Sequence, residues 1–154
     1  MFNIRVYGIL LNEDKQVLVS DELIRGACIT KFPGGGLELG EGTRDCLKRE
    51  FMEEMNLNVD ITDHLYTTDF YQQSAFNTDH QIISIYYFVK PLEPIKVPLR
   101  TKPFDFDETQ MQVYEAKRET ETFRFIDWNN FSDSELTLPI DKVVANLLKN
   151  EYEF

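Results

Sequence analysis

The chain has 154 residues, of which 42% are hydrophobic and 13% aromatic, so we expect one globular domain over residues 1–154 with a core of its own. Its 16 Lys and Arg stand against 27 Asp and Glu, a formal net charge of −11. This excess of acid argues against a nucleic-acid partner, which needs a basic face, and against an anionic membrane surface. An anionic small molecule stays possible if divalent metal ions lie between it and the protein.

The cysteine content and the apolar runs indicate the compartment. Cys28 and Cys46 are too few for a disulfide framework, which favours a reducing environment. The apolar run at residues 6–11 is too short for a signal peptide, and no stretch approaches the roughly 18 apolar residues of a membrane span. We therefore expect a cytoplasmic protein.

In the first forty residues, apolar or alternating runs predict short strands at 3–11, 16–19, 30–32 and 37–39. A turn at 12–14 joins the first two, which predicts a hairpin. The run of one proline and three glycines at 33–36 predicts a stop in regular structure.

The rest of the chain alternates helices and strands. We expect a helix at 44–55 with Thr43 as its N-cap, strands in 58–71, 81–89 and 123–128, and a final helix at 141–149. The segment 81–89 is apolar on both faces, as in a central strand, and Val143, Val144, Leu147 and Leu148 form the stripe of the final helix. Residues 91–122, rich in proline and charge, predict a long functional or mobile loop. This order predicts the α/β (α+β) class with a mixed sheet.

Three acidic residues of the first predicted helix are spaced for one cation site. Glu50, Glu53 and Glu54 stand at i, i+3 and i+4, which places them on one arc of about 100°. Their repulsion destabilises the helix unless a cation removes it, and their hard oxygen atoms suit Mg²⁺ or Mn²⁺. The alternative is a solvated helix face that is acidic by chance. The neighbouring stripe of Leu47, Phe51 and Met55 is the predicted core side.

The residues around this arc favour the metal site over the solvated face. Three glycines at 34–36 let the backbone approach a ligand closely. Glu41 precedes the helix, and Arg49 can orient a carboxylate through a charge-assisted hydrogen bond.

From Gly35 the sequence reads GGLELGEGTRDCLKREFMEEMNL, which resembles the box of the Nudix (MutT-like) hydrolase family. That box is G, five residues, E, seven residues, then R-E-U-x-E-E-x-G-U, with U apolar. The matching positions are Gly35, Glu41, Arg49, Glu50, Phe51, Glu53, Glu54 and Leu57. The box departs at Asn56, which replaces a glycine, and mildly at the bulky Phe51. Asn tolerates the left-handed backbone that ends a helix.

The resemblance implies a Nudix-type αβα sandwich around a mixed β-sheet and a divalent metal, Mg²⁺ or Mn²⁺. In the family, the positions of Glu53 and Glu54 bind the metal, and that of Glu50 binds a further cation or helps to activate water. The carbonyl at the position of Gly34 can join the coordination. The position of Glu41 supports the site or contacts metal, and that of Arg49 holds a glutamate in place.

Further candidates lie outside the box. Some family members carry an extra metal ligand or base in a loop near Glu115, Glu119 and Glu121, and of these we favour Glu121; a solvated loop is the alternative. The aromatic residues Phe70, Tyr71 and Phe76 could stack on a base or simply pack between strands. His64 and His80 lack metal-ligand spacing and are expected at the surface. Cys46 has no neighbouring base and is not expected to be a nucleophile.

The implied activity is pyrophosphohydrolysis of a nucleoside diphosphate linked to another group. The substrate class stays open between nucleoside triphosphates and nucleotide sugars such as ADP-ribose. A short chain favours the former, and the long segment 91–122 favours the latter. The alternative is a non-catalytic, nucleotide-sensing Nudix-fold module, although such modules usually lack box carboxylates. A homodimer is plausible for the family.

Overall fold

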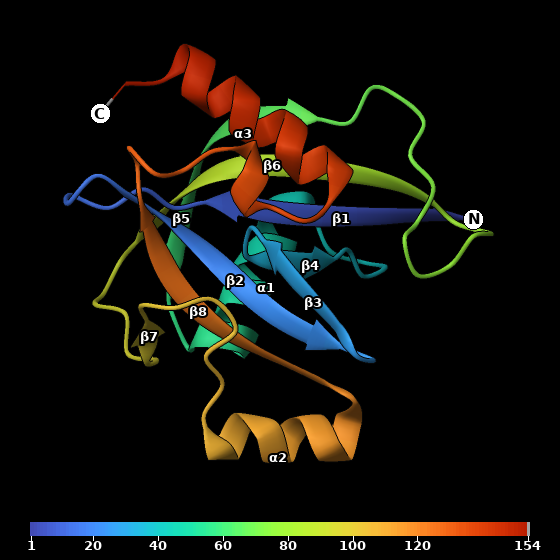
Figure 1. The fold of residues 1–154 in the computed structure, drawn as a ribbon. Coiled ribbons are helices and arrows are strands. Elements are labelled where there is room, and N and C mark those ends of the chain that lie inside the picture. The colour runs from blue at the N-terminus through green and yellow to red at the C-terminus, as the bar shows by residue number, and fades with distance from the viewer. Residues whose placement is uncertain (154) are drawn as a thin grey trace. The chain divides into compact units, whose positions relative to one another are not determined.

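The computed structural model describes residues 1–153, which form two compact units. Unit 1 comprises Met1–Leu10 and Pro33–Lys96, and unit 2 comprises Leu11–Phe32 and residues 97–153. Each unit contains one four-stranded sheet in which parallel and antiparallel pairs occur together. The predicted mixed α and β class is thus confirmed (Figure 1). One domain over residues 1–154 stays a prediction.

The sheet of unit 1 has the strand order β4-β1-β6-β5. β1 (Phe2–Ile9) pairs in parallel with β6 (Gln81–Pro91), which is antiparallel to β5 (Val59–Thr67) on its other side. The predicted central strand at 81–89 is therefore confirmed. β4 (Gly34–Gly36) pairs antiparallel with β1 and forms the edge of the sheet. The helix α1 (Thr43–Met55) follows β4 and packs against β1, β4 and β5.

The sheet of unit 2 has the order β3-β2-β8-β7. β2 (Gln16–Ile24) lies between β3 (Ala27–Lys31) and β8 (Glu119–Asp127), and both pairs are antiparallel. The short β7 (Leu99–Arg100) adds to β8 in parallel. Apolar residues of β2 and β8 are buried, among them Val17, Leu18, Val19, Phe123 and Ile126.

Three helical segments complete unit 2. α2 (Glu108–Lys117) contacts β8, into which it leads (Figure 1). A short 3₁₀ turn, η1 (Asp133–Glu135), contacts the final helix α3 (Pro139–Glu151). None of the helices in residues 1–153 is long and apolar enough to cross a bilayer.

Several sequence expectations about local structure are wrong. β1 and β2 do not form a hairpin of paired strands, because they belong to different sheets; one antiparallel bridge, between Leu11 and Val17, flanks the predicted turn. The glycines at 34–36 do not stop regular structure but form β4, while residues 37–39 are not a strand. Pairing with β1 holds these glycines extended against their weak intrinsic preference for strands.

The segment 91–122 is also not a structureless loop, because it contains β7 and α2. In α2 no residue is buried, so the helix has no apolar stripe for a periodicity argument to find. A capping box starts it instead: the Asp107 carboxylate accepts the Gln110 N–H at 2.8 Å, and the Gln110 side chain accepts the Asp107 N–H at 2.9 Å.

The buried stripe of α3 differs in part from the predicted one. It consists of Ile140, Val144, Ala145 and Leu148, together with Asp141. Val143 is 39% exposed, and Leu147 is only half-buried. The helix begins two residues earlier than predicted, with a proline in its first turn.

Candidate active site

The ends of α1 differ in how their backbone groups are satisfied. Its N-cap is Gly42, which makes no side-chain cap hydrogen bond. The prediction of Thr43 as N-cap is therefore wrong: the Thr43 hydroxyl instead hydrogen-bonds the Tyr87 hydroxyl at 2.7 Å. At the other end Asn56 adopts the left-handed conformation, with φ 49° and ψ 44°, and its N–H bonds the Met52 carbonyl. The expectation that Asn56 can end the helix is confirmed.

The rotation of α1 is fixed by its apolar side. Leu47, Phe51 and Met55 are at most 1% exposed, which confirms the predicted core stripe. A Cβ at Gly8 of β1 would lie 2.9 Å from Phe51 Cε2 and 2.6 Å from Val89 Cγ2, so glycine lets the helix approach the sheet closely. With this side buried, the acidic arc at the border of the stripe has a fixed direction.

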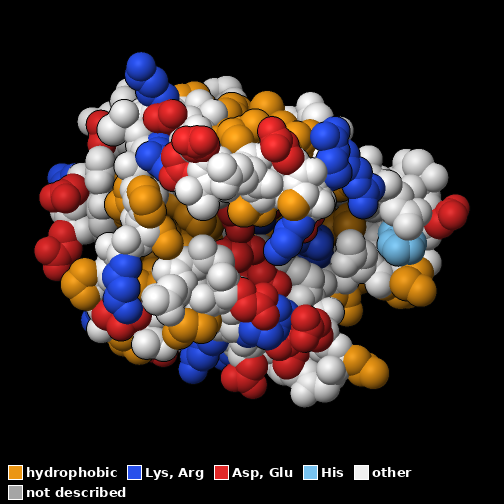
Figure 2. Space-filling view, turned by 90° about the horizontal axis from the view of Figure 1, so that it is seen from below, with side chains coloured by type: hydrophobic (Ala, Val, Ile, Leu, Met, Phe, Trp, Pro, Cys, Tyr) orange, Lys and Arg blue, Asp and Glu red, His pale blue; other side chains and the backbone are white. Residues whose placement is uncertain are grey.

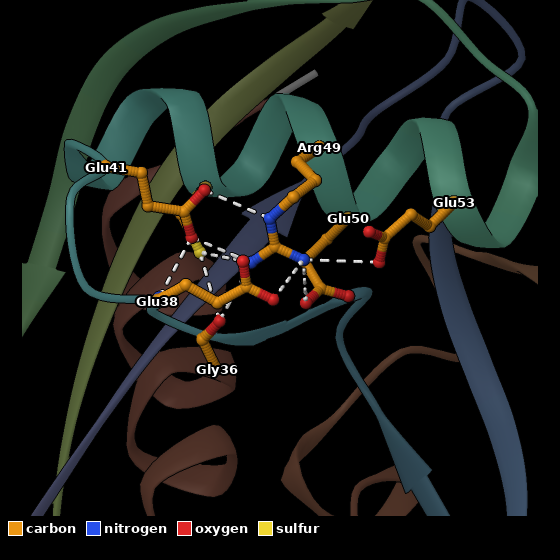
Figure 3. A network of polar contacts seen from close by, with 7 residues as sticks. Gly36, Glu38, Glu41, Arg49, Glu50 and Glu53 are labelled. Carbon is orange, nitrogen blue, oxygen red and sulfur yellow. Dashed lines mark hydrogen bonds and ion pairs between the residues drawn. The ribbon is translucent and has the colours of Figure 1, made fainter.

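The guanidinium of Arg49 is the centre of the polar network in Figure 3. Arg49 Nε and Nη2 donate to the two carboxylate oxygen atoms of Glu41 at 3.0 and 2.7 Å, a bidentate pair. Nη2 also donates to the Gly36 carbonyl at 3.0 Å. Nη1 donates to Glu50 at 3.1 Å and to Glu53 at 3.2 Å. These bonds use the five N–H groups of an arginine.

Glu41 is the anchor of this arginine. Besides Arg49, its carboxylate accepts the backbone N–H of Glu38 at 2.9 Å. The hydrogen bond from Arg49, followed by that from the Glu38 backbone, lowers the pKa of Glu41 from 4.5 to about 2. The pair in turn raises the pKa of Arg49, chiefly through its hydrogen bond to Glu41. Both groups are thus charged throughout the physiological pH range.

Glycines of β4 bring the backbone against the helix. A Cβ at Gly35 would lie 2.5 Å from the carboxylate carbon of Glu50, so any larger residue would displace that carboxylate. Gly34 has φ 149°, and a Cβ there would clash with the Val6 carbonyl oxygen. The Glu50 side chain is only 12% exposed, whereas that of Glu53 is 58% exposed. Glu50 is therefore held in place on the glycine strand.

The charges in this network do not balance. Nη1 of Arg49 also lies 3.6 Å from Glu38 Oε1, so one guanidinium faces four carboxylates: Glu38, Glu41, Glu50 and Glu53. Glu54 adds a fifth acid on the same helix and is half-buried. Acidic side chains are also conspicuous on the face shown in Figure 2, with basic ones among them. Surplus carboxylates in a fixed frame favour a bound cation.

The donor set fits a divalent cation in chemistry. Glu50, Glu53 and Glu54 supply hard carboxylate oxygens. The close approach of the Gly35 backbone fixes the carboxylate of Glu50. Within residues 1–153, however, no three His, Cys, Asp or Glu side chains are grouped as metal ligands. In Figure 3, Nη1 of Arg49 bonds both Glu50 and Glu53. The guanidinium thus bridges two of the three carboxylates that the sequence predicts as metal ligands.

The buried Cys46 belongs to the frame of the site. Its thiol donates to the Gly36 carbonyl at 3.5 Å, and Arg49 Nη2 lies 3.7 Å from its sulfur. Burial, with the nearby Glu41, raises the pKa of the Cys46 thiol to about 12. The group is therefore a neutral thiol at physiological pH, consistent with the expectation that it is not a nucleophile.

The remaining candidates are not among the partners of Arg49 described above. Phe70, Tyr71 and Phe76 of unit 1 are 40%, 69% and 49% exposed. Glu121 lies in strand β8 of unit 2, not in a loop, and accepts the Ser20 hydroxyl at 2.6 Å. His64 is exposed, as expected, and lies in β5; His80 is half-buried.

Two residues of the Arg49 network were not predicted from the sequence. The Gly36 carbonyl bonds Arg49, and Glu38 lies beside the same guanidinium. Both residues lie inside the box, between Gly35 and Glu41, and the acidic character of Glu38 in that loop was the available signal.

The chain was compared with protein families and with known proteins. The NUDIX domain family matches residues 1–143. No curated protein matches the chain.

Solved structures share the fold. A Nudix hydrolase of Nitrosomonas europaea is 15% identical with a TM-score of 0.64, covering 100% of this chain and 93% of that one. MutT described from Aliivibrio salmonicida and Vibrio cholerae is 15% identical with a TM-score of 0.62, covering 99% and 100%. An ADP-ribose pyrophosphatase of Streptococcus suis is 15% identical with a TM-score of 0.59, covering 99% and 94%. At such identities the likeness concerns the fold, while the family rests on the sequence match. The chain belongs to the Nudix family of hydrolases, which act on acid anhydrides in phosphorus-containing compounds.

Proposed function

We propose that this chain is a Mg²⁺- or Mn²⁺-dependent pyrophosphohydrolase that cleaves the diphosphate linkage of a nucleoside diphosphate derivative. The observation that carries this proposal is the acidic arc of α1, in which Glu50 is fixed against Gly35, together with the four carboxylates that surround the guanidinium of Arg49. Such a surplus of fixed negative charge suits a site whose substrate arrives with divalent metal.

The proposed metal ligands are Glu53 and Glu54, with Glu50 and the carbonyl of Gly34 as further donors. When bound, the metal neutralises the charge of the diphosphate and lowers the pKa of a water molecule. Glu53 must leave Arg49 to bind it, and the 58% exposure of its side chain allows this movement. In this proposal Glu41 supports Arg49 rather than binding metal, because both its oxygen atoms already accept hydrogen bonds.

Glu50 is the proposed acceptor of the proton from the attacking water. Its carboxylate is held by the close approach of Gly35 and by Arg49 Nη1 at 3.1 Å, so it stays in one position when Glu53 moves. A fixed carboxylate beside the reacting water is what general base catalysis requires. Arg49 acts by holding Glu50 in this position.

The exposed rings of Phe70, Tyr71 and Phe76 are proposed to stack on the base of the nucleotide. Their exposure supports this role, because rings that only packed between strands would be buried. The substrate is a nucleoside triphosphate or a nucleotide sugar such as ADP-ribose. The printed names of two similar structures, MutT and an ADP-ribose pyrophosphatase, are compatible with either class. Glu121 stays a predicted additional ligand.

The cellular setting is part of the proposal. The partner is a small-molecule nucleotide and not a nucleic acid, in keeping with the net charge of −11. Cys28 and Cys46 are free thiols, which supports a cytoplasmic location. A homodimer stays a prediction.

A phosphate-release assay with Mg²⁺ and a panel of nucleoside triphosphates and nucleotide sugars tests the proposal. We expect metal-dependent release from at least one compound. The alternative, a nucleotide-sensing module, predicts tight binding of one nucleotide without release from any. That result would replace the proposed function.

The substitution Glu54→Gln gives the sharpest variant. It preserves the shape of the side chain but removes a charged ligand, so we expect kcat to fall about 1,000-fold or more. Urea unfolding should be nearly unchanged, since Glu54 is only half-buried. Undiminished turnover by the folded variant would contradict the assignment of the arc as the metal site.

A further inference from the structure

One nitrogen of Arg49 has three carboxylates around it and only two hydrogens to donate. Nη1 donates to Glu50 at 3.1 Å and to Glu53 at 3.2 Å, which uses both of its N–H groups. The third carboxylate is that of Glu38, whose Oε1 lies 3.6 Å from the same nitrogen. That distance is too long for a hydrogen bond. Glu38 is therefore a charged neighbour of Arg49 that is not one of its hydrogen-bond acceptors.

Glu38 has a fixed backbone and an exposed side chain. It lies in the loop between β4 and α1, where its N–H donates to Glu41 Oε1 at 2.9 Å, and Glu41 is itself bonded to Arg49. Its side chain is 67% exposed, and Figure 3 shows the carboxylate turned toward the guanidinium. A shift of about 0.5 Å would bring Oε1 within hydrogen-bond distance of Nη1. The carboxylate can make this movement while the backbone of the loop stays in place.

Glu53 is the partner of Arg49 that has to leave when a divalent cation binds as proposed. Its departure leaves one N–H of Nη1 without an acceptor, at a guanidinium whose side chain is only 22% exposed. An unsatisfied donor of a charged, partly buried group is costly, so an acceptor that replaces Glu53 makes its departure easier. Glu41 and Glu50 already bond Arg49, whereas Glu38 gives up no hydrogen bond to Arg49 by moving closer.

We propose that Glu38 takes the place of Glu53 at Nη1 of Arg49 when Glu53 binds the divalent cation. This inference rests on the proposed function. It makes Glu38 a positioning residue, which acts through Arg49 and not as a ligand of the metal. Nη1 then keeps two acceptors, Glu50 and Glu38, so the position of Glu50 does not depend on the partner of Glu53. The exchange lowers the cost of releasing Glu53 and thereby raises the affinity for the metal.

The exchange can be separated from a simple effect of the charge of Glu38. A carboxylate near a bound cation strengthens its binding by attraction alone, or by direct coordination, whatever residue stands at position 53. In Glu53→Gln the amide oxygen can stay bonded to Nη1, and no acceptor has to be replaced. The effect of Glu38 therefore disappears in this background if it arises from exchange, and it persists if it arises from charge or coordination. A double-mutant cycle measures this difference.

The experiment measures Mn²⁺ affinity for wild type, Glu38→Ala, Glu53→Gln and the double variant. Asp45→Ala is the matched control, because Asp45 is an exposed acid of α1 outside the Arg49 network. Electron paramagnetic resonance of free Mn²⁺ gives Kd without substrate and without turnover. Urea unfolding checks that each variant is folded, which we expect for Glu38→Ala because its side chain is largely exposed.

We expect Glu38→Ala to raise the Kd for Mn²⁺ about 3- to 10-fold in the wild-type background, as for the loss of one hydrogen bond. In the Glu53→Gln background the same substitution should change Kd by less than about 2-fold. Asp45→Ala should also stay within about 2-fold of wild type. An unchanged Kd in folded Glu38→Ala, an equal rise in both backgrounds, or an equal rise with Asp45→Ala would overturn the inference.

The failure of this inference differs from the failure of the proposed function. If wild type binds Mn²⁺ but hydrolyses no compound of the panel, the proposed activity fails, and the cycle still decides the role of Glu38. If wild type is active and the cycle gives one of the contrary results, only the exchange fails. If wild type binds no Mn²⁺, both are overturned.

Discussion

Two arginines, one in each unit, organise polar networks that differ in their charge balance. In unit 2, Arg124 donates to Asp21 through Nε at 2.6 Å and Nη2 at 3.2 Å, and the two residues are 8% and 0% exposed. Asp21 also accepts the Thr30 hydroxyl at 2.7 Å and the Phe104 N–H at 3.2 Å. One charge therefore meets one charge, and the carboxylate is fully hydrogen-bonded. In unit 1, Arg49 meets four carboxylates.

The difference separates a structural network from the network that we propose to be functional. A balanced, buried pair has little to gain from a ligand, and it resists the loss of either partner because the other charge would remain buried. An unbalanced cluster at a half-exposed position is destabilising by itself and becomes favourable when a cation arrives. The surplus of acid around Arg49, and not the number of its ion pairs, is therefore the feature on which the proposed site rests.

The largest effect that we expect is on the free energy of unfolding, and it concerns the balanced pair of Asp21 and Arg124. Asp21→Ala leaves Arg124 buried without its carboxylate, so we expect the free energy of unfolding to fall by about 3–5 kcal/mol. Asp105→Ala, at an exposed position, is the matched control and should change it by less than about 0.5 kcal/mol. Urea unfolding measures both. A loss of under about 1 kcal/mol for Asp21→Ala would show that the pair is not structural.

Arg49→Lys should affect catalysis more than stability. A lysine keeps the charge, but its ammonium group lacks the planar guanidinium that makes two parallel hydrogen bonds to Glu41. It therefore cannot bond Glu41 in this way and also reach the Gly36 carbonyl and Glu50. We expect kcat to fall about 10- to 100-fold, with KM changed less, because Glu50 loses its position. Steady-state kinetics and urea unfolding on the same preparation separate the two effects. Wild-type kcat in this variant would remove Arg49 from the mechanism.

The smallest effect is the pH dependence that Glu41 confers. Its folded-state pKa of about 2 lies below its ordinary value of 4.5, so its contribution to stability is full above pH 4.5 and is lost as the pH falls toward 2. Glu41→Gln should be less stable than wild type at pH 7, and the difference should shrink between pH 4.5 and 2. Urea unfolding at several pH values checks this. A difference that is independent of pH would contradict the charged pairing with Arg49.

The sequence predicts the local structure of α1 better than it predicts the pairing of the strands. The predicted helix 44–55 agrees with α1 to within one residue, and its buried stripe and the left-handed Asn56 are confirmed, because helix periodicity and end signals are local. The acidic arc is likewise predicted from the sequence spacing of its three glutamates alone, because they belong to one helix. The roles of its residues as ligands stay predictions.

The wrong predictions of strand pairing share one physical cause, which is that strands pair with partners far away in the sequence. The partner of β1 on one side is β6, some eighty residues later in the chain, and no turn signal at residues 12–14 could reveal this. The bond between Asp21 and Arg124 likewise joins residues 103 positions apart. For α2 the sequence contains a local signal, because Asp107 and Gln110 have the spacing of a capping box. The proline and charge content of residues 91–122 favours a loop instead, and this prediction is wrong for α2.

The most direct test of the central claim is a titration with Mn²⁺, followed by electron paramagnetic resonance of the free ion, on wild type, Glu53→Gln and Asp21→Asn. The account predicts that wild type and folded Asp21→Asn bind Mn²⁺ with similar affinity, and that Glu53→Gln binds at least about 10-fold more weakly. Equal binding by wild type and Glu53→Gln, or no binding by wild type, would contradict the assignment of the acidic arc of α1 as a metal site.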